Sequence, residues 1–525
     1  MRSSFLRLNC SSNTLGNKHV NKKILYLADL TRKVRALQKR KKVVVQSHGV
    51  FDIIHPGVVQ HLNAAKEQGN ILVVTVIKDK DVKAGPGRPI FNEQLRLENV
   101  ASLEQVDFVT LVDEDVPFDC VRLIKPDVFA KGKAFKDRDQ AIHGKIFARE
   151  KELYFGKIKI FETEGFAFSS QQIVNNFLSI YPGETKKFLK ELGRQYNFKQ
   201  ITERLNKLKG LKVLIIGDGI IDEYHYCESL GISAKHPLVA NRYLTHESFA
   251  GGAFAIANHI AGLCEQVHLV TLLGSTDSRE AFIADNLKPN ITTKLFFRDD
   301  GPTIVKKRYI HQYLNQKLFE VNYLNNNPIN AACENKITAY LENAIDKHDI
   351  VLVSDFGHGL ITHKLIKLIE KKAHKYAVNT QTNAANAGYN MLTKYLKPYF
   401  ICVDENELRL AAQEKHAAVE EVARGIKSRV KAQYMIVTRG RSGSLGLGKN
   451  DEANYTPIFS TKVVDTIGAG DAFFAFTAPC FAVGMPLDLV SFIGNAVGAL
   501  AVQIVGNKKP VEKHELLKFV HNLLK

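Results

Sequence analysis

The chain has 525 residues, of which 45% are apolar and 24% charged, so it is long enough for two or three domains that each bury a hydrophobic core. Its seven cysteines stand singly, which argues against a disulfide framework or a zinc site and for the reduced thiols of a cytoplasmic protein. No apolar run is long enough to cross a bilayer, because Pro479, Gly484 and Pro486 interrupt the best candidate, so we expect no membrane partner.

The net charge of +18 is concentrated near the N-terminus. Residues 1–42 hold twelve Lys or Arg and a single acid, Asp29, and so carry +11 by themselves. Residues 1–23 lack the apolar core of a secretory signal and are predicted to be a basic disordered extension. A basic arm that contacts nucleic acid is the less favoured alternative. The rest of the chain is only mildly basic, as suits an enzyme for phosphorylated substrates.

The first half of the chain alternates between strand and helix patterns. After a helical stretch at about 25–38, β-branched runs predict strands at 43–46, 71–77, 108–112 and 128–130, with helices at 58–68 and 92–103 between them. Strands separated by helices of this size indicate parallel βαβ units. We therefore expect a first α/β domain over residues 24–182.

A motif at residues 47–58, Ser-His-Gly-Val-Phe-Asp-Ile-Ile-His-Pro-Gly-Val, follows the first predicted strand and opens a helix. Backbone N–H groups at a helix N-terminus bind phosphate. The motif resembles the Gly-x-Phe-Asp-x-x-His-x-Gly-His signature of cytidylyltransferase-like nucleotidyltransferases, and further matches follow as far as Phe168. The resemblance implies that His55 stabilises the transferred nucleotidyl group. It also implies that the nucleotide is bound by Gly49, Phe51, Gly57, Arg88, Lys131, Ser169 and Ser170.

One position departs from that signature. Its second histidine is Val58, which donates no hydrogen bond, and loss of one such donor typically costs on the order of 10²–10³ in rate. His61 lies one helical turn later and could partly compensate, although a surface or core histidine is the plainer interpretation. Three hypotheses stay open: a working transferase with a modified site, a weak or altered-specificity enzyme, and a degenerate module for binding and oligomerisation.

The second half begins with a charged stretch, residues 183–206, predicted to be a helical linker. A new α/β series follows, with strands predicted at 212–217, 267–273, 350–354 and 434–438. We therefore expect a second, independent domain over residues 207–525.

The most specific motif lies at residues 464–476, Val-Asp-Thr-Ile-Gly-Ala-Gly-Asp-Ala-Phe-Phe-Ala-Phe. Gly468, Ala469 and Gly470 precede a predicted buried helix, where small residues leave backbone N–H groups free to form an anion hole. Asp471 falls in the first turn, where a carboxylate would repel a bound anion. A general base that takes the proton of a hydroxyl attacking phosphorus explains it better than binding alone. The string resembles the signature of the ribokinase-like (PfkB) sugar kinases.

Other segments of the second domain resemble the same family. The resemblance assigns sugar binding to Asp222, Gly251, Gly252, Lys306 and Asp355. It assigns nucleotide binding to Asp404, Glu407, Thr438 and Gly440, with Asp404 in place of the asparagine of the family's Asn-x-x-Glu. A carboxylate there can still organise hydrated Mg²⁺, but no dedicated metal site is predicted. The segment Asn-Thr-Gln-Thr-Asn at residues 379–383 is distinctive, yet its pattern assigns it no role.

The pairing of the two domains resembles the bifunctional heptose-phosphate kinase / nucleotidyltransferase type, with the halves in reversed order. The resemblance implies a Rossmann-like nucleotidyltransferase α/β domain followed by a ribokinase-like three-layer α/β/α domain, in a homodimer. The first hypothesis is a bifunctional enzyme of nucleotide-sugar synthesis. It would phosphorylate a sugar or sugar phosphate with Mg·ATP and transfer a nucleotidyl group from ATP or CTP to a sugar 1-phosphate. The alternative is a sugar kinase whose first domain is a non-catalytic binding or oligomerisation module.

Overall fold

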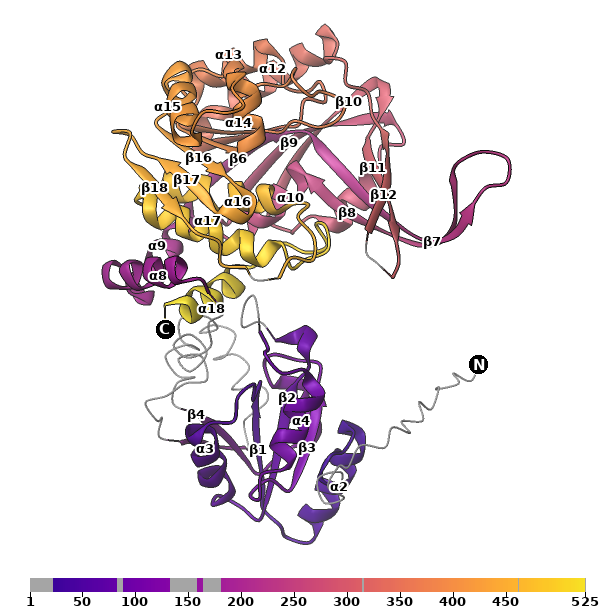
Figure 1. The fold of residues 1–525 in the computed structure, drawn as a ribbon, viewed down its shortest axis with the longest axis vertical. Coiled ribbons are helices and arrows are strands. Elements are labelled where there is room, and N and C mark those ends of the chain that lie inside the picture. The colour runs from indigo at the N-terminus through magenta and orange to yellow at the C-terminus, as the bar shows by residue number, and fades with distance from the viewer. Residues whose placement is uncertain are drawn as a thin grey trace. The chain divides into compact units, whose positions relative to one another are not determined.

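The computed structural model describes residues 22–82, 88–132, 158–163, 181–313, 316–460 and 462–524. The chain divides into two compact units, a smaller one over Met1–Ser179 and a larger one over Ile180–Leu524, and each is considered by itself (Figure 1). The predictions for residues 1–21 and for Ser169 and Ser170 lie outside the described residues.

The described part of the smaller unit is built on a five-stranded parallel sheet in the order β3-β2-β1-β4-β5. The predicted parallel βαβ arrangement is therefore confirmed. The strands are β1 (Val44–Gly49), β2 (Ile71–Ile77), β3 (Phe108–Val112), β4 (Val128–Gly132) and β5 (Lys159–Thr163). The helices are α2 (Leu27–Lys39), α3 (Pro56–Lys66), η1 (Asp79–Asp81), α4 (Glu93–Ala101) and α5 (Phe118–Ile124).

Helices cover both faces of this sheet, because successive side chains of a strand point to opposite faces. Val44 of β1 belongs to a core that includes Leu30 of α2. Its neighbour Val45 belongs to the opposite core, with Leu62 of α3. A strand buried on both faces reads as a continuous apolar run, which is why β2 and β3 were predictable to the residue.

The larger unit contains, among its described residues, a nine-stranded sheet in the order β10-β9-β6-β13-β14-β15-β16-β17-β18. Its strands run parallel except for β17 and β18, which pair antiparallel at one edge. The strands are β6 (Lys212–Gly217), β9 (Gln266–Thr276), β10 (Ile291–Pro302), β13 (Ile350–Asp355), β14 (Tyr376–Thr380), β15 (Phe400–Asp404), β16 (Tyr434–Thr438), β17 (Ser444–Leu447) and β18 (Ala453–Thr456).

Helices pack on both sides of this sheet, so the three-layer α/β/α architecture is confirmed (Figure 1). One side is covered by α12 (Ala331–Ala344), α13 (His363–Lys372), α14 (Glu405–Ala412) and α15 (Val419–Val430). The other side carries α10 (Ala253–Ala261), α16 (Ala469–Ala482) and α17 (Leu487–Ala501). Helix α16 is apolar all round and buried from Asp471 to its end, as expected of a helix enclosed on every face. Further helices of the larger unit are α11 (Glu280–Asn286), α18 (Lys513–Leu523), η2 (Lys207–Gly210), η3 (Ile345–Lys347), η4 (Leu392–Lys394) and η5 (Gly440–Ser442).

A separate four-stranded sheet, here called the lid sheet, lies beside the main sheet in the order β12-β11-β7-β8 (Figure 1). Its strands are β7 (Gly219–Ile232), β8 (Val239–Gly252), β11 (Ile304–His311) and β12 (Gln316–Tyr323). Strands β7 and β8 form a long antiparallel hairpin, and β11 joins β7 in parallel. The period of two along β7 sends Asp222 to one face of the lid sheet and Glu223 to the other.

The stretch predicted as a linker forms two helices, α8 (Gly183–Gln195) and α9 (Phe198–Asn206), that pack onto the larger unit. The hydroxyl of Tyr196 donates to Asp488 of α17 over 3.0 Å, and the ring of Phe198 lies 4.7 Å from that of His521 in α18. The apolar side of each helix is thus buried against the larger unit. The charged residues on the other side are what made the sequence look like a linker. Among the described residues, no helix combines the length and apolarity that a membrane span requires.

Candidate active site

A cavity of about 680 Å³ in the larger unit is lined by residues of both the main sheet and the lid sheet. Asn379, Asp404 and Thr438 reach it from the carboxyl ends of β14, β15 and β16, where open parallel sheets bind their ligands. Asp222 and Lys306 reach it from the lid sheet. The structure therefore brings together predicted residues that lie up to 250 positions apart in the sequence.

The N-terminus of α16 opens into this cavity at Gly468, Ala469 and Gly470. Gly468 caps the helix in the left-handed region, with φ of 80°, and a Cβ there would lie 2.1 Å from Oδ1 of Asn507. Only glycine fits this position without strain. A Cβ on Gly470 would meet no atom within 4 Å, so this residue faces open space. The first N–H groups of a helix have no partner inside it. The N–H of Ala469 donates to the backbone oxygen of Thr466 over 3.3 Å, which leaves those of Gly468 and Gly470 for an anion in the cavity.

Asp471 lies buried in the first turn of α16 and lines the same cavity. Burial raises the pKa of its carboxyl to about 7, and the nearby negative charges of Asp222 and Glu407 add to the rise. The amide Nε2 of Gln381 donates to Oδ1 of Asp471 over 2.5 Å, which opposes the rise because it stabilises the charged form. A carboxylate with a pKa near neutrality suits a general base.

Gln381 was missed by sequence reasoning, although it lies in the distinctive polar segment after β14. Its amide also donates to Oδ1 of Asn379 over 3.2 Å, and Asn379 in turn donates to the backbone oxygen of Cys402 over 3.1 Å. This chain of hydrogen bonds fixes the amide that contacts Asp471. A polar run directly after a buried strand, at the carboxyl end of a parallel sheet, is the signal that could have identified it.

The lid side of the cavity carries paired and unpaired charges. Asp222 accepts hydrogen bonds from Arg308 and, over 3.2 Å, from Asn507, and Arg308 also pairs with Glu320 over 2.7 Å. Lys306 is buried, and within the described part of the chain no carboxylate lies within ion-pair distance of its ammonium. Burial lowers the pKa of Lys306, which is the effect expected of an ammonium that lacks water. The cavity thus contains a positive charge that an anionic ligand can satisfy.

The predicted nucleotide residues line another part of the cavity wall. Asp404 and Glu407 form the capping box of α14: Asp404 accepts from the N–H of Asn406 over 2.9 Å, and Glu407 accepts from the N–H of Asp404 over 3.0 Å. Glu407 also accepts from the N–H of Thr382 over 2.9 Å. Burial raises the pKa of Glu407 to about 7. Both Thr438 and Gly440 line the cavity as well.

Two predicted sugar-binding residues do not line the cavity. Gly251 packs against the Asp222 carboxylate, where a Cβ would lie 2.2 Å from Oδ2, so it provides room for that side chain. Asp355 is buried beneath the loop after β13. It accepts from the hydroxyl of Tyr395 over 2.5 Å and pairs with Lys394 over 2.6 Å. Its oxygens are engaged in holding that loop. Gly252, the second glycine of the motif, does line the cavity.

In the smaller unit, the turn between β1 and α3 carries the nucleotidyltransferase motif. Phe51 adopts a φ of 52°, a left-handed conformation that is costly for an aromatic residue and typical of functional turns. Asp52 holds the turn: it pairs with Arg88 over 2.6 Å and accepts from the N–H groups of Ile90 and Phe91 over 2.9 and 3.0 Å. Gly49 ends β1 at the start of this turn.

The other described residues of the motif lie at and beyond the start of α3. His55 caps the helix, and Gly57 stands in its first turn. Lys131, at the end of β4, lies 3.5 Å from Glu162 of β5. Arg88 and Lys131 are therefore each next to a carboxylate, which offsets part of their charge.

The structure does not support His61 as a substitute for the missing histidine. Its Nε2 is hydrogen-bonded to the Ser47 hydroxyl and its Nδ1 to the Thr163 hydroxyl, each over 2.8 Å. Burial lowers the pKa of His61, so the ring is neutral near pH 7 and both its nitrogens are already used. Val58 packs against the apolar core of the unit. The plainer interpretation, an internal histidine, agrees with these contacts.

Comparison with known proteins assigns a family to each unit. Residues 211–514, more than half of the chain, match the pfkB family of carbohydrate kinases, and residues 47–175 match the cytidylyltransferase-like family. The chain is 24% identical over 311 residues to the Bifunctional protein HldE of Trichlorobacter lovleyi, which covers 59% of this chain and 62% of that protein. It is 26% identical over 319 residues to the protein of the same name from Haemophilus influenzae, with 60% and 64% covered.

The chain thus spans about three fifths of the length of these curated relatives. Among solved structures, the phosphofructokinase-2 of Escherichia coli in complex with substrates and products is similar at 16% identity and a TM-score of 0.49. That similarity covers 60% of this chain and 100% of the other.

Proposed function

Because the chain belongs to the pfkB family of carbohydrate kinases, we propose that its larger unit transfers the γ-phosphoryl group of ATP to a hydroxyl of a sugar or sugar phosphate. One observation carries this proposal. Asp471, a buried carboxylate with a pKa of about 7, stands in the first turn of a helix whose N-terminus opens into the cavity. A proton acceptor is thereby placed next to an anion-binding helix end, which is the combination that phosphoryl transfer to a hydroxyl requires.

The chemistry follows from these positions. The acceptor oxygen forms a bond to the γ-phosphorus while the bond between that phosphorus and the oxygen bridging to the β-phosphate breaks, and ADP leaves. The acceptor's hydroxyl proton passes to Asp471. Charge on the transferring group is stabilised by the N–H groups of Gly468 and Gly470 and by the helix dipole.

Mg²⁺ fits the nucleotide side of this cavity. It usually keeps several waters and is held through one or two carboxylates together with substrate phosphates, and Asp404 and Glu407 both line the cavity. When bound, the ion would neutralise charge on the phosphates. Both carboxylates already accept backbone N–H bonds, which fixes their orientation.

Lys306 favours a sugar phosphate over an uncharged sugar as the acceptor. A buried ammonium without a carboxylate partner among the described residues is costly unless a ligand supplies the negative charge. Asp222 lies on the same face of the lid sheet and lines the cavity, and its remaining lone pairs can accept from a sugar hydroxyl beside its bonds from Arg308 and Asn507. We therefore place the acceptor's phosphate near Lys306 and its hydroxyls near Asp222.

For the smaller unit we keep the bifunctional proposal, in which it transfers a nucleotidyl group from ATP or CTP to a sugar 1-phosphate with His55 at the reacting phosphate. The match of residues 47–175 to the cytidylyltransferase-like family supports it. A second candidate is a kinase whose smaller unit only binds nucleotide or mediates assembly. Two observations favour this candidate: Val58 is apolar, and both nitrogens of His61 are already hydrogen-bonded.

We also propose a homodimer in the cytoplasm. The outer face of the lid sheet exposes Tyr243, Phe319 and Tyr323 by about half of their surface, and exposed apolar patches mark interaction sites. The six described cysteines are all free, which supports a reducing compartment. Analytical ultracentrifugation of the wild type and of Phe319→Ser tests the dimer, because the substitution should shift the equilibrium toward monomer.

The kinase proposal is tested with Asp471→Asn and a panel of sugars and sugar phosphates, with ADP formation as the signal. We expect the variant to lose two to four orders of magnitude, the usual contribution of a general base. Asp488→Asn is the matched control, since Asp488 also lies in the first turn of a helix of this unit but outside the cavity. Sugar-dependent ADP formation that survives in Asp471→Asn would refute the assignment.

The transferase proposal is tested separately, by pyrophosphate release from ATP or CTP with candidate sugar 1-phosphates. Release that His55→Ala abolishes supports the bifunctional enzyme. No release with either nucleotide favours the kinase with a non-catalytic smaller unit.

A further inference from the structure

A second cavity in the larger unit, here called the lysine pocket, has a volume of about 580 Å³ and shares no lining residue with the Asp471 cavity. It lies where α12 and η3 meet the edge of the nine-stranded sheet. Its walls are His268 of β9, Lys294 and Phe296 of β10, and Lys336, Ala339, Tyr340, Asn343, Ala344, Lys347 and His348 of α12 and the turn after it.

The charge of the lysine pocket is entirely positive. Lys294, Lys336 and Lys347 line it, and its lining includes no Asp or Glu. In the part of the chain that the structure describes, none of these three ammonium groups lies within ion-pair distance of a carboxylate. Nearby Lys372, by contrast, pairs with Asp346 over 3.1 Å. Three like charges gathered around one concavity repel each other, and a bound anion removes that repulsion.

Aromatic rings hold one of these lysines in place. The ammonium of Lys294 lies 5.3 Å from the ring centroid of Phe296 and 5.4 Å from that of Tyr340, and the two rings meet edge to face. Cation–π contacts of this kind orient an ammonium without neutralising its charge. The Tyr340 hydroxyl is in turn hydrogen-bonded to Nε2 of His268 over 2.9 Å. The positive charge is thus preorganised by its aromatic neighbours.

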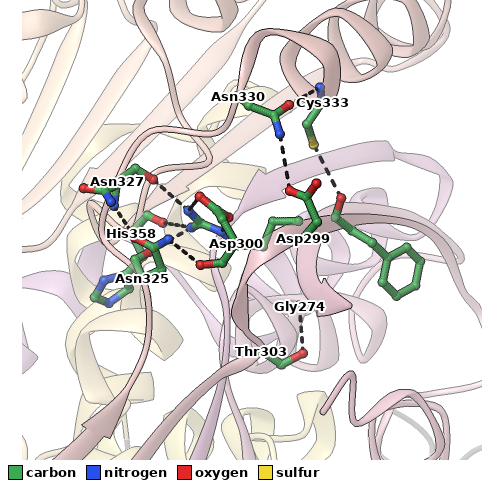
Figure 2. A network of polar contacts seen from close by, with 11 residues as sticks. Gly274, Asp299, Asp300, Thr303, Asn325, Asn327, Asn330, Cys333 and His358 are labelled. Atoms are coloured by element: carbon green, nitrogen blue, oxygen red, sulfur yellow. Dashed lines mark hydrogen bonds and ion pairs between the residues drawn. The ribbon is translucent and has the colours of Figure 1, made fainter. Parts of the chain in front are cut away.

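Strand β10 and helix α12, which form two walls of the lysine pocket, are also joined by polar contacts outside its lining residues (Figure 2). At the start of α12, Asn330 donates to Asp299 of β10 over 3.4 Å, and the Cys333 thiol lies 3.8 Å from the backbone oxygen of Phe297. The guanidinium of Arg298, in the same strand, donates to the backbone oxygens of Asn325 and Asn327, just before the helix. A pocket with a rigid frame binds without first having to be assembled.

We propose that the lysine pocket is a binding site for a phosphate-bearing small molecule, separate from both substrate sites. Its phosphate oxygens would be held by Lys294, Lys336 and Lys347. The amide of Asn343 in α12 donates one hydrogen bond to the backbone oxygen of Ala339 and has a second N–H for the ligand. The cavity volume falls within the range of small-molecule sites. Lys336 and Lys347 are exposed, whereas Lys294 is half-buried against the aromatic wall. A small molecule is favoured over an acidic protein segment because all three lysines line one pocket with that wall.

The test uses the full chain and inorganic pyrophosphate as the probe, with binding followed by isothermal titration calorimetry at low salt. The pocket variant replaces Lys294, Lys336 and Lys347 with glutamine. The matched control replaces Lys367, Lys371 and Lys415, three exposed lysines outside both cavities, in the same way. Pyrophosphate binding at the substrate sites should contribute the same heat in the wild type, the pocket variant and the control variant. The difference in binding between the pocket variant and the other two therefore measures binding at the lysine pocket.

We expect the pocket variant to lose one class of sites, or to bind it more weakly by on the order of tenfold or more, while the control retains it. Equal binding by the wild type and both variants would overturn the proposal. So would an equal loss in both variants, because it would reveal a general charge effect. A poly-glutamate peptide could bind in a way that depends on the three lysines while pyrophosphate does not bind. That result would overturn the proposal in favour of an acidic protein partner.

Discussion

Replacing Gln381 with leucine should move the pH dependence of the kinase reaction without removing its catalytic group. The amide of Gln381 donates to Asp471 and stabilises its ionised form, the form that accepts a proton. Leucine has a similar size but no donor. The pKa of Asp471, about 7 in the wild type, should therefore rise further.

The size of the effect follows from the strength of that contact. A hydrogen bond to a charged group contributes roughly 1.5–3 kcal/mol, and about 1.4 kcal/mol corresponds to one pKa unit, so the pKa should rise by about one to two units. Asp471 is only 5% exposed, so water replaces little of the lost contact. At pH 7 the ionised fraction would fall roughly 5- to 50-fold, and near pH 9.5 most of it would be restored.

The assay is kcat/KM for sugar-dependent ADP formation between pH 5.5 and 9.5. In the wild type the rate should rise with pH through about 7, since the base must be deprotonated. In Gln381→Leu the same rise should occur about one to two pH units higher. Gln503→Leu, the same change outside the cavity, should leave the profile unchanged.

Two results would refute this reasoning. A profile that stays at the wild-type position would show that Gln381 does not tune Asp471. Activity that remains low at pH 9.5 would show that the amide has another role, such as positioning the substrate.

Three further predictions concern single positions. Gly468→Ala should lower the thermal unfolding midpoint, because a non-glycine residue in the left-handed region costs roughly 1–2 kcal/mol and the new Cβ would also clash with Asn507. Gly470→Ala should leave the midpoint unchanged and impair only kinase activity, because its Cβ would point into open space. Asp471→Asn should gain stability relative to the wild type as the pH rises from about 4 to about 7, by at most about 4 kcal/mol. Over this range the carboxyl ionises in the unfolded chain but keeps its proton in the folded one, so the wild type loses stability. Denaturant unfolding at pH 4 and pH 8 measures this change, and an equal difference between the two proteins at both pH values would contradict it. If the smaller unit is a transferase that lacks one hydrogen-bond donor, Val58→His should raise the rate of pyrophosphate release by on the order of 10²-fold at most. An unchanged rate would favour the non-catalytic alternative.

Asp355, predicted to bind sugar, does not line the cavity, so its sugar-binding role stays a prediction without support from its position. Its position after a buried strand was correct, and the strand was predicted to within one residue. Its carboxylate, however, is taken by Tyr395 and Lys394, which come from a segment about 40 residues later. A local pattern cannot show which distant side chain will occupy a hydrogen-bonding group.

Gln381 and His61 illustrate the same limit in opposite directions. Gln381 gains its importance from a contact with a residue 90 positions away, so its own segment carried no assignable role. His61 loses its proposed role because Ser47 and Thr163, on two different strands, take both of its ring nitrogens. In each case a contact with residues distant in the sequence decided what the side chain can do.

The sequence by itself determined the features that depend on neighbouring residues. Continuous apolar runs predicted the parallel strands because those strands are buried on both faces. The small residues before Asp471 predicted the start of a helix, and Gly468 is required there because its backbone is left-handed. Only the tertiary structure decided which groups share a cavity, how the lid sheet places Lys306 and Asp222 beside Asp471, and how far the pKa of that carboxyl rises. Burial and the approach of charges are long-range effects, and they exist only once distant segments have packed together.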